Sequence, residues 1–202
     1  MAPLRPLSRV SERRRGAGKR ILVLDVKTLR LDLPLLSPEL LEALAKGDLE
    51  RSRTLAPFEL PPAFDADERE LFSMRSEQAR EPAWRPWLLR ALVLRERGSM
   101  IGYANFHGPP GVNDTGSPDA LEIGYTVFPE FRGQGFATEA AQGLLDFARL
   151  DFGVTHFIAG ILPSNAPSIR VIEKLGFVRT SIVVEGELIF DLRLPPPPGR
   201  FT

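Results

Sequence analysis

The chain has 202 residues, of which 43% are hydrophobic and 26% charged, a composition typical of a soluble globular protein rather than a disordered or fibrous one. Basic and acidic residues number 26 each, so no strong overall field favours nucleic acid or an anionic membrane. The sequence has no cysteine, which excludes disulfides, thiolate metal sites and a cysteine acyl-enzyme. No apolar run approaches the about 20 residues that cross a bilayer. We expect a cytoplasmic protein without a membrane partner.

The two ends of the chain differ from the domain expected over residues 21–194. Residues 1–20 carry seven basic side chains against one acid and show no hydrophobic period, which predicts a flexible basic tail. Such a tail could bind RNA or the ribosome; we favour the alternative of a solvated extension. Residues 195–202 form a proline-rich second tail, because prolines 195–198 cannot donate the hydrogen bonds of a strand.

Hydrophobic periodicity and turn residues predict a mixed α/β order of elements. Alternating leucines predict a strand over 20–35. A helix over 38–46 is predicted by Ser37 as its cap, Pro38 as its first residue and Gly47 as its stop. The other expected elements are a polar helix 67–80, strands 87–95, 100–107 and 120–128, a helix 135–150, a strand 155–161, a helix 166–175, and strands 177–184 and 187–194.

The most informative segment joins the strand 120–128 to the helix that follows it. Its turn reads Arg132-Gly133-Gln134-Gly135-Phe136-Ala137. Glycines allow a ligand to approach the backbone closely, and the start of a helix offers unpaired N–H groups, so phosphate is an expected ligand. The spacing matches neither the P-loop nor the dinucleotide fingerprint. The apolar face of the helix comprises Ala137, Ala140, Ala141, Leu144, Leu145 and Ala148.

At these residues the chain resembles the GNAT superfamily of N-acetyltransferases, whose coenzyme A loop, [Q/R]-x-x-G-x-[G/A], is matched by Arg132, Gly135 and Ala137. The segment ILPSNAPSIRVIEKLGF, residues 161–177, resembles the second motif of the family. Together with EIGY before the loop, it resembles the branch of ribosomal-protein N-terminal (Rim-type) acetyltransferases, over roughly residues 25–194. The resemblance implies a mostly antiparallel twisted sheet of about seven strands flanked by about four helices.

The resemblance also implies how acetyl-CoA, the expected co-substrate, would bind. The pantetheine arm would run beside the backbone of Tyr125, Thr126 and Val127, where their strand splays from the next one. The pyrophosphate would lie on the loop and the first turn of the helix. The residues concerned are Arg132, Gly133, Gln134, Gly135, Phe136, Ala137 and Thr138, and Asn165 and Ser168 would lie near the thiol. We expect no metal.

Glu122 is the expected general base. It points away from the apolar side of its strand, and a carboxylate can accept the proton that an attacking amine loses, directly or through water. The alternative is a solvated strand glutamate. The reference pKa of an α-amine lies about 2.6 units below that of lysine, or roughly 3.5 kcal/mol, so one base suits an α-amine more easily. We therefore expect a peptide N-terminus as the acceptor.

Other polar residues have two interpretations each. Asn165 can cap its helix, and Ser168 in the first turn could protonate the leaving thiolate or position the thioester; a purely structural role suits both equally. The resembled family commonly has a tyrosine acid where this chain has Ile172, so the general acid stays unassigned. Of the two tyrosines, Tyr125 is expected in the core, and neither it nor Tyr103 replaces the acid convincingly.

The remaining ring side chains are expected to pack rather than to react. His107 and His156 lie far apart in sequence, without the carboxylate clustering of a metal site, and are expected to serve packing. The aromatic residues that could line a cleft are more often core residues; they are Trp84, Trp87 and Phe106.

Three alternatives to N-terminal acetylation stay open. The nearest is acetylation of a small amine, including an aminoglycoside. A second is a non-catalytic acyl-CoA sensor that kept the loop and lost the chemistry. A third, an RNA adaptor that uses the basic tail, is disfavoured by the neutral net charge. The sequence does not decide whether the protein forms a homodimer.

Overall fold

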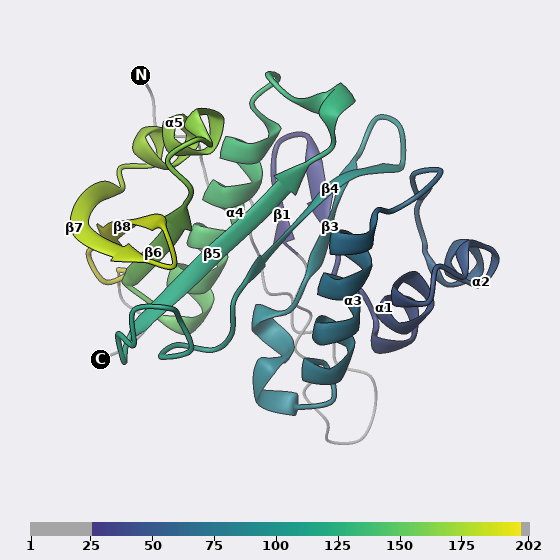
Figure 1. Cartoon of the computed structure of the whole chain (residues 1–202), viewed down its shortest axis with the longest axis horizontal. Helices are drawn as coiled ribbons and strands as arrows, with labels where there is room; N and C mark the ends of the chain where they lie inside the picture. The colour runs from purple at the N-terminus through teal and green to yellow at the C-terminus, as the bar shows by residue number, and fades with distance from the viewer. Residues whose placement is uncertain (1–25, 199–202) are drawn as a thin grey trace.

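The computed structural model describes residues 26–198, so the expected basic tail and residues 199–202 lie outside the described residues. An open, mostly antiparallel sheet forms the centre, with the strand order β1-β2-β3-β4-β5-β6-β8-β7. Helices cover both faces of this sheet (Figure 1). Within residues 26–198 no helix is long and apolar enough to cross a membrane.

The predicted mixed α/β class is confirmed. The strands are β1 Val26–Lys27, β2 Leu31–Leu33, β3 Arg90–Leu94, β4 Ser99–Phe106, β5 Ala120–Val127, β6 His156–Ile161, β7 Val178–Val184 and β8 Glu187–Arg193. The α-helices are α1 Pro38–Ala45, α2 Leu49–Leu55, α3 Ala66–Gln78, α4 Phe136–Phe152 and α5 Ala166–Lys174, and two 3-10 helices span Pro82–Trp87 and Pro129–Phe131. The described part therefore has one strand and one α-helix more than predicted.

The additional strand arises because the segment predicted as one strand over 20–35 contains a hairpin. Strands β1 and β2 pair antiparallel, and Leu29 at the tip between them is 67% exposed. The N–H of Thr28 donates to the carbonyl of Leu31 at 2.9 Å, and its hydroxyl donates to Glu139 of α4 at 2.6 Å. A residue 111 positions away thus holds the turn, which the local pattern of leucines cannot indicate.

The additional helix, α2, begins directly after the stop of α1. Gly47 ends α1 with φ at 70°, as predicted, and Asp48 then caps α2 by accepting a hydrogen bond from the N–H of Arg51 at 3.0 Å. Only Ser52 of α2 is buried, so this helix has no apolar face that periodicity could detect.

Two apolar clusters hold the layers together, one on each face of the sheet. On one face, α4 contributes Ala140 and Leu144, which are fully buried against the sheet, and the predicted apolar face of this helix is confirmed. On the other face, α1 and α3 contribute Leu41 and Phe72, also fully buried. Burial of one large apolar side chain contributes about 1.5–3 kcal/mol, so both helix layers are firmly fixed to the sheet.

Strands β5 and β6 are the parallel pair of the described sheet, and they separate part-way along. Their pairing runs from Ala120 opposite His156 to Glu122 opposite Ile158. Beyond Glu122, β5 pairs with β4 alone, and β6 pairs with β8 alone. Glu122 therefore lies where the two strands part, and the following residues of β5 have no strand partner on that edge.

Candidate active site

The N-terminus of α4 is built to face an anion. Gly135 is the N-cap, with φ at 83°, and no side chain caps the helix. The first intrahelical bond is donated by the N–H of Glu139 to the carbonyl of Gly135 at 3.0 Å. The preceding N–H groups, of Phe136, Ala137 and Thr138, consequently have no intrahelical acceptor. Gly133 also has a positive φ, 75°, and the loop before α4 is exposed.

Arg30, from the tip of the β1–β2 hairpin, joins this loop to the body of the protein. Its Nη1 donates to the carbonyl of Gln134 at 3.0 Å, and its Nε donates to Glu139 at 2.6 Å. The guanidinium also lies 4.2 Å from the centre of the Phe136 ring. Sequence reasoning missed Arg30 because the hairpin that carries it was not predicted.

A second arginine, Arg132, and the ion-paired carboxylate of Glu139 lie beside the loop. Arg132 donates from Nε to the carbonyl of Val127 at 2.9 Å, which ties the loop to the end of β5. Burial by itself would raise the pKa of Glu139, but the hydrogen bonds from Thr28 and Arg30 lower it below its usual range. Glu139 is therefore an anion that balances Arg30 rather than a free acid.

Tyr125 of β5 contacts the segment 161–177, which contains the second motif. The hydroxyl of Tyr125 donates to the carbonyl of Ser168 at 3.3 Å, and the side chain of Asn165 caps α5 by accepting from the N–H of Ser168 at 3.2 Å. The predicted cap is confirmed, and the structure brings these three residues together. Burial raises the pKa of Tyr125 to about 12. Ile172, at the position of the missing tyrosine acid, is fully buried in the core.

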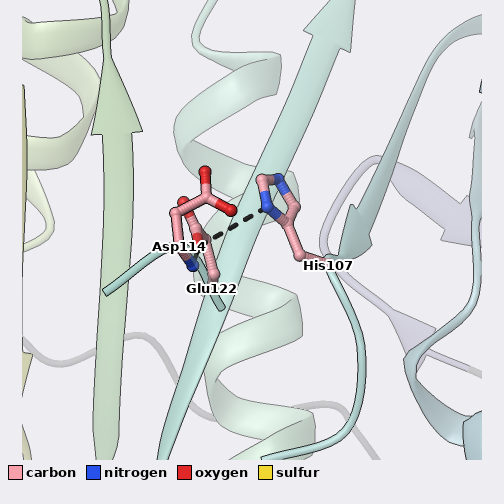
Figure 2. Close-up of side chains that lie close together, drawn as sticks. All are labelled: His107, Asp114 and Glu122. Atoms are coloured by element: carbon pink, nitrogen blue, oxygen red, sulfur yellow. Dashed lines mark hydrogen bonds and ion pairs between the residues drawn. The ribbon is translucent and has the colours of Figure 1, made fainter. Parts of the chain in front are cut away.

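Glu122 is fully buried, so its interpretation as a solvated strand glutamate is wrong. Its Oε2 accepts a hydrogen bond from the backbone N–H of Asp114 at 2.8 Å and lies 3.5 Å from Nδ1 of His107. Figure 2 shows the imidazole of His107 and the loop at Asp114 turned toward this carboxylate. Its Oε1 is buried beside Gly160 of β6.

Glu122 is the anionic member of an acidic group. Burial would raise its pKa, but the His107 imidazole and the backbone N–H groups of Asp114 and Gly160 outweigh burial and lower it. The pKa of Asp114 and that of Glu187 are raised, first by burial and then by the charge of Glu122. A Cβ at Gly160 would collide with Oε2 of Glu187 and lie 3.3 Å from Oε1 of Glu122, so glycine leaves room for both carboxylates.

Both histidines lie beside carboxylates, so the prediction that neither clusters with acids is wrong. His156 is buried, as its packing role predicts, but its Nδ1 lies 2.9 Å from Asp119 and its Nε2 lies 2.6 Å from Asp191. His107, Asp114 and Glu122 place one ligand atom each within 4.8 Å of one another, a donor set that a divalent cation could also use. Because His107 follows β4, Asp114 lies in a loop and Glu122 lies in β5, no local spacing in the sequence indicates the group.

Of the three aromatic residues that could line a substrate cleft, two are buried in the core. Trp87 and Phe106 are 6% and 1% exposed, and their ring centres lie 5.7 Å apart in an edge-to-face contact. Trp84, in the 3-10 helix before β3, is partly exposed. The core interpretation is thus confirmed for two of the three.

Comparison with known proteins decides the family. Residues 30–178 match the model of the acetyltransferase (GNAT) domain. The chain belongs to the GNAT acetyltransferase family. A relative, the uncharacterized N-acetyltransferase YnaD of Bacillus subtilis strain 168, is 32% identical over 88 residues, which are 44% of this chain and 48% of YnaD. This GNAT chain thus matches about half the length of that relative.

Solved structures of acetyltransferases share the fold. An acetyltransferase from Agrobacterium tumefaciens strain C58 superposes with a TM-score of 0.60 at 20% identity, covering 90% of this chain and 99% of that chain. RimJ of Mycobacterium smegmatis, in complex with a CoA disulfide, superposes with a TM-score of 0.56 at 21% identity, covering 84% and 87%. The predicted GNAT fold is confirmed, and its structural neighbours include Rim-type enzymes.

Proposed function

We propose that this GNAT protein transfers the acetyl group of acetyl-CoA to an amine, and that the acceptor is the α-amine of a peptide N-terminus. One observation carries the proposal: the buried anionic Glu122 lies where β5 and β6 part, and β5 leads directly to the uncapped N-terminus of α4. A site for an anionic co-substrate and a base for an amine thus share one strand-turn-helix unit.

The residues present suit coenzyme A. The unpaired N–H groups of Phe136, Ala137 and Thr138, with those of the glycine loop before them, would hold the pyrophosphate, and the macrodipole of the 17-residue α4 favours the negative charge. Arg132 and Arg30 would add positive charge at the same place.

The pantetheine arm would occupy the edge of β5 that lacks a strand partner. From Tyr125 to Val127 this edge no longer pairs with β6, so its backbone groups are available to amides of a ligand. Tyr125 also brings the backbone of Ser168 to this edge, which would place Ser168 and Asn165 beside the thiol end of the arm.

Glu122 would provide the basic charge for the proton that the amine loses, directly or through an intervening group, and Ser168 would stand near the departing sulfur. The amine would attack the thioester carbon directly, since the chain has no cysteine to form an acyl-enzyme. The charges of Asp114 and Glu187 around Glu122 would attract an ammonium group. An α-amine loses its proton about 2.6 pKa units more easily than lysine, which favours it as acceptor.

The test removes the charge of Glu122. Glu122→Gln should lower kcat for peptide acetylation by about 10²–10⁴-fold, the usual contribution of a general base, without changing the Kd for acetyl-CoA. Glu173→Gln, on α5, serves as a matched control and should leave both values unchanged. Full activity of the Glu122→Gln variant would contradict the assigned base.

A further inference from the structure

We propose that His107 is a catalytic residue: its imidazole takes the proton from the acceptor amine, while the buried Glu122 orients the imidazole and balances its charge. The proposal rests on the proposed acetyl transfer and goes beyond it, because it names the group that meets the amine. The histidine lies directly after β4, outside both sequence motifs of the family resemblance.

Accessibility separates the two residues. The side chain of Glu122 is 0% exposed, whereas that of His107 is 37% exposed. One oxygen of Glu122 accepts from the N–H of Asp114, and the other is buried against Gly160 of β6. An amine arriving from solvent therefore reaches the imidazole before it can reach either carboxylate oxygen.

The backbone fixes the imidazole in this position. The N–H of His107 donates to the carbonyl of Glu122 at 2.8 Å, which sets the two residues opposite each other across β4 and β5. From the other side, the buried guanidinium of Arg75 on α3 donates to the carbonyl of His107 at 2.9 Å. His107 is thus held between the sheet and a helix rather than placed on a free loop.

The two ring nitrogens face different surroundings. Nδ1 lies 3.5 Å from Glu122, and a Cβ at Gly124 would lie 3.3 Å from Nε2. The imidazole therefore occupies space over β5 that a side chain at Gly124 would fill, with Nε2 directed along the strand beyond Glu122 (Figure 2). This is the direction in which β5 leaves β6, where the thioester is proposed to lie.

The charges around the ring suit an imidazolium. Glu122 faces it from β5, Asp114 from the covering loop and Glu187 from the start of β8, while Glu185 of the β7–β8 turn adds its charge beside Asp114 and Glu187. A carboxylate on one nitrogen and a substrate on the other is the arrangement in which histidine acts as a general base, because the carboxylate fixes the tautomer and stabilises the charged ring.

With Nδ1–H directed to Glu122, the Nε2 lone pair of His107 takes one proton from the ammonium group. The freed nitrogen pair forms the C–N bond, the C–S bond breaks, and the sulfur leaves with its electron pair. The second nitrogen proton ends on the sulfur, and the His107 imidazolium returns its proton to solvent. One amide, one thiol and one free proton result.

The experiment uses His107→Ala in the full chain, with short peptides bearing a free N-terminal alanine, serine or methionine as acceptors. We expect kcat to fall by about 10²–10⁴-fold with an unchanged Kd for acetyl-CoA. Added imidazole should restore a saturable part of the rate to His107→Ala, in step with the neutral fraction of imidazole, and none to Glu122→Gln. His107→Asn, which keeps a polar side chain, should be equally slow. Its thermal unfolding transition should show that the variant is folded.

Three results would overturn the proposal, and they are distinguishable from one another. If His107→Ala and His107→Asn acetylate at the wild-type rate while Glu122→Gln does not, Glu122 acts without the imidazole and the proposed function stands. If both His107 variants are slow but added imidazole does not restore the rate of His107→Ala at any pH, His107 has a structural role. A wild-type protein that binds acetyl-CoA and acetylates none of the peptides would instead remove the proposed function together with this inference.

Discussion

Substitution of Gly135 by aspartate tests the anion site at the start of α4. Gly135 has φ at 83°, and a Cβ built there would meet only a side-chain nitrogen of Arg30, at 3.5 Å. The backbone conformation costs a non-glycine residue about 1–2 kcal/mol. For a chain of this size, each kcal/mol lowers the unfolding midpoint by about 2–4 °C. The variant should therefore fold, with a modest loss of stability.

The effect on acetyl-CoA binding should be larger and electrostatic. Two unit charges at about 4 Å interact by about 1 kcal/mol in bulk water and about 4 kcal/mol near a protein surface. An aspartate beside a bound pyrophosphate should therefore raise the Kd for acetyl-CoA by roughly 5- to 900-fold, at 1.36 kcal/mol for each factor of ten.

Gly47→Asp provides the matched control. Gly47 has φ at 70°, and its added Cβ would also meet only an arginine side chain, that of Arg69 at 3.7 Å. It lies after α1, in the layer on the other face of the sheet from α4 (Figure 1). Calorimetric titration and thermal unfolding should show similar losses of stability in both variants and weaker binding in Gly135→Asp alone. Equal Kd values in the two variants would refute the placement of the pyrophosphate.

Three further predictions follow from side chains around the site. Arg30→Ala should raise the Kd for acetyl-CoA about two- to tenfold by calorimetry, because it removes a cation from the loop and leaves Glu139 facing the ligand; an unchanged Kd would place the ligand elsewhere. Because the folded pKa of Glu139 lies below its ordinary value of 4.5, its charge stabilises the fold above that value and ceases to do so as pH falls through the folded pKa. The unfolding midpoint of wild type should thus exceed that of Glu139→Gln near neutral pH and converge with it in acid, and a difference that grew on acidification would count against the ion pair. Since the pKa of Tyr125 is about 12, Tyr125→Phe should leave the pH profile of kcat/KM unchanged up to about pH 10, and loss of an alkaline limb in this variant would show that Tyr125 ionises.

Local rules were sufficient where a short segment sets its own structure. Ser37, Pro38 and Gly47 define α1, with its predicted end one residue too late, because capping and termination act within one turn. The glycine loop and the apolar stripe of α4 are also local, and both lie where they were predicted.

Structure set by distant residues was not predictable in this way. The β1–β2 turn depends on Glu139 in α4, and Arg30 reaches the glycine loop only because of that turn. His107 meets Glu122 through strand pairing and Asp114 through a covering loop, so a sequence without alignment records neither contact. The pattern of β5 correctly turned Glu122 away from the apolar side but could not show that a loop buries it.

Titration of the protein with acetyl-CoA, followed by thiol release on addition of N-terminal peptides, tests directly whether the chain acetylates peptide α-amines. We expect saturable binding at one site and thiol release with peptides, with acetyl found on the α-amine by mass spectrometry. Small amines and aminoglycosides tested in the same way would reveal a different acceptor. Binding without acetylation of any amine would indicate an acyl-CoA sensor, and no binding of acetyl-CoA would contradict both the cofactor site at α4 and the proposed acetyl transfer.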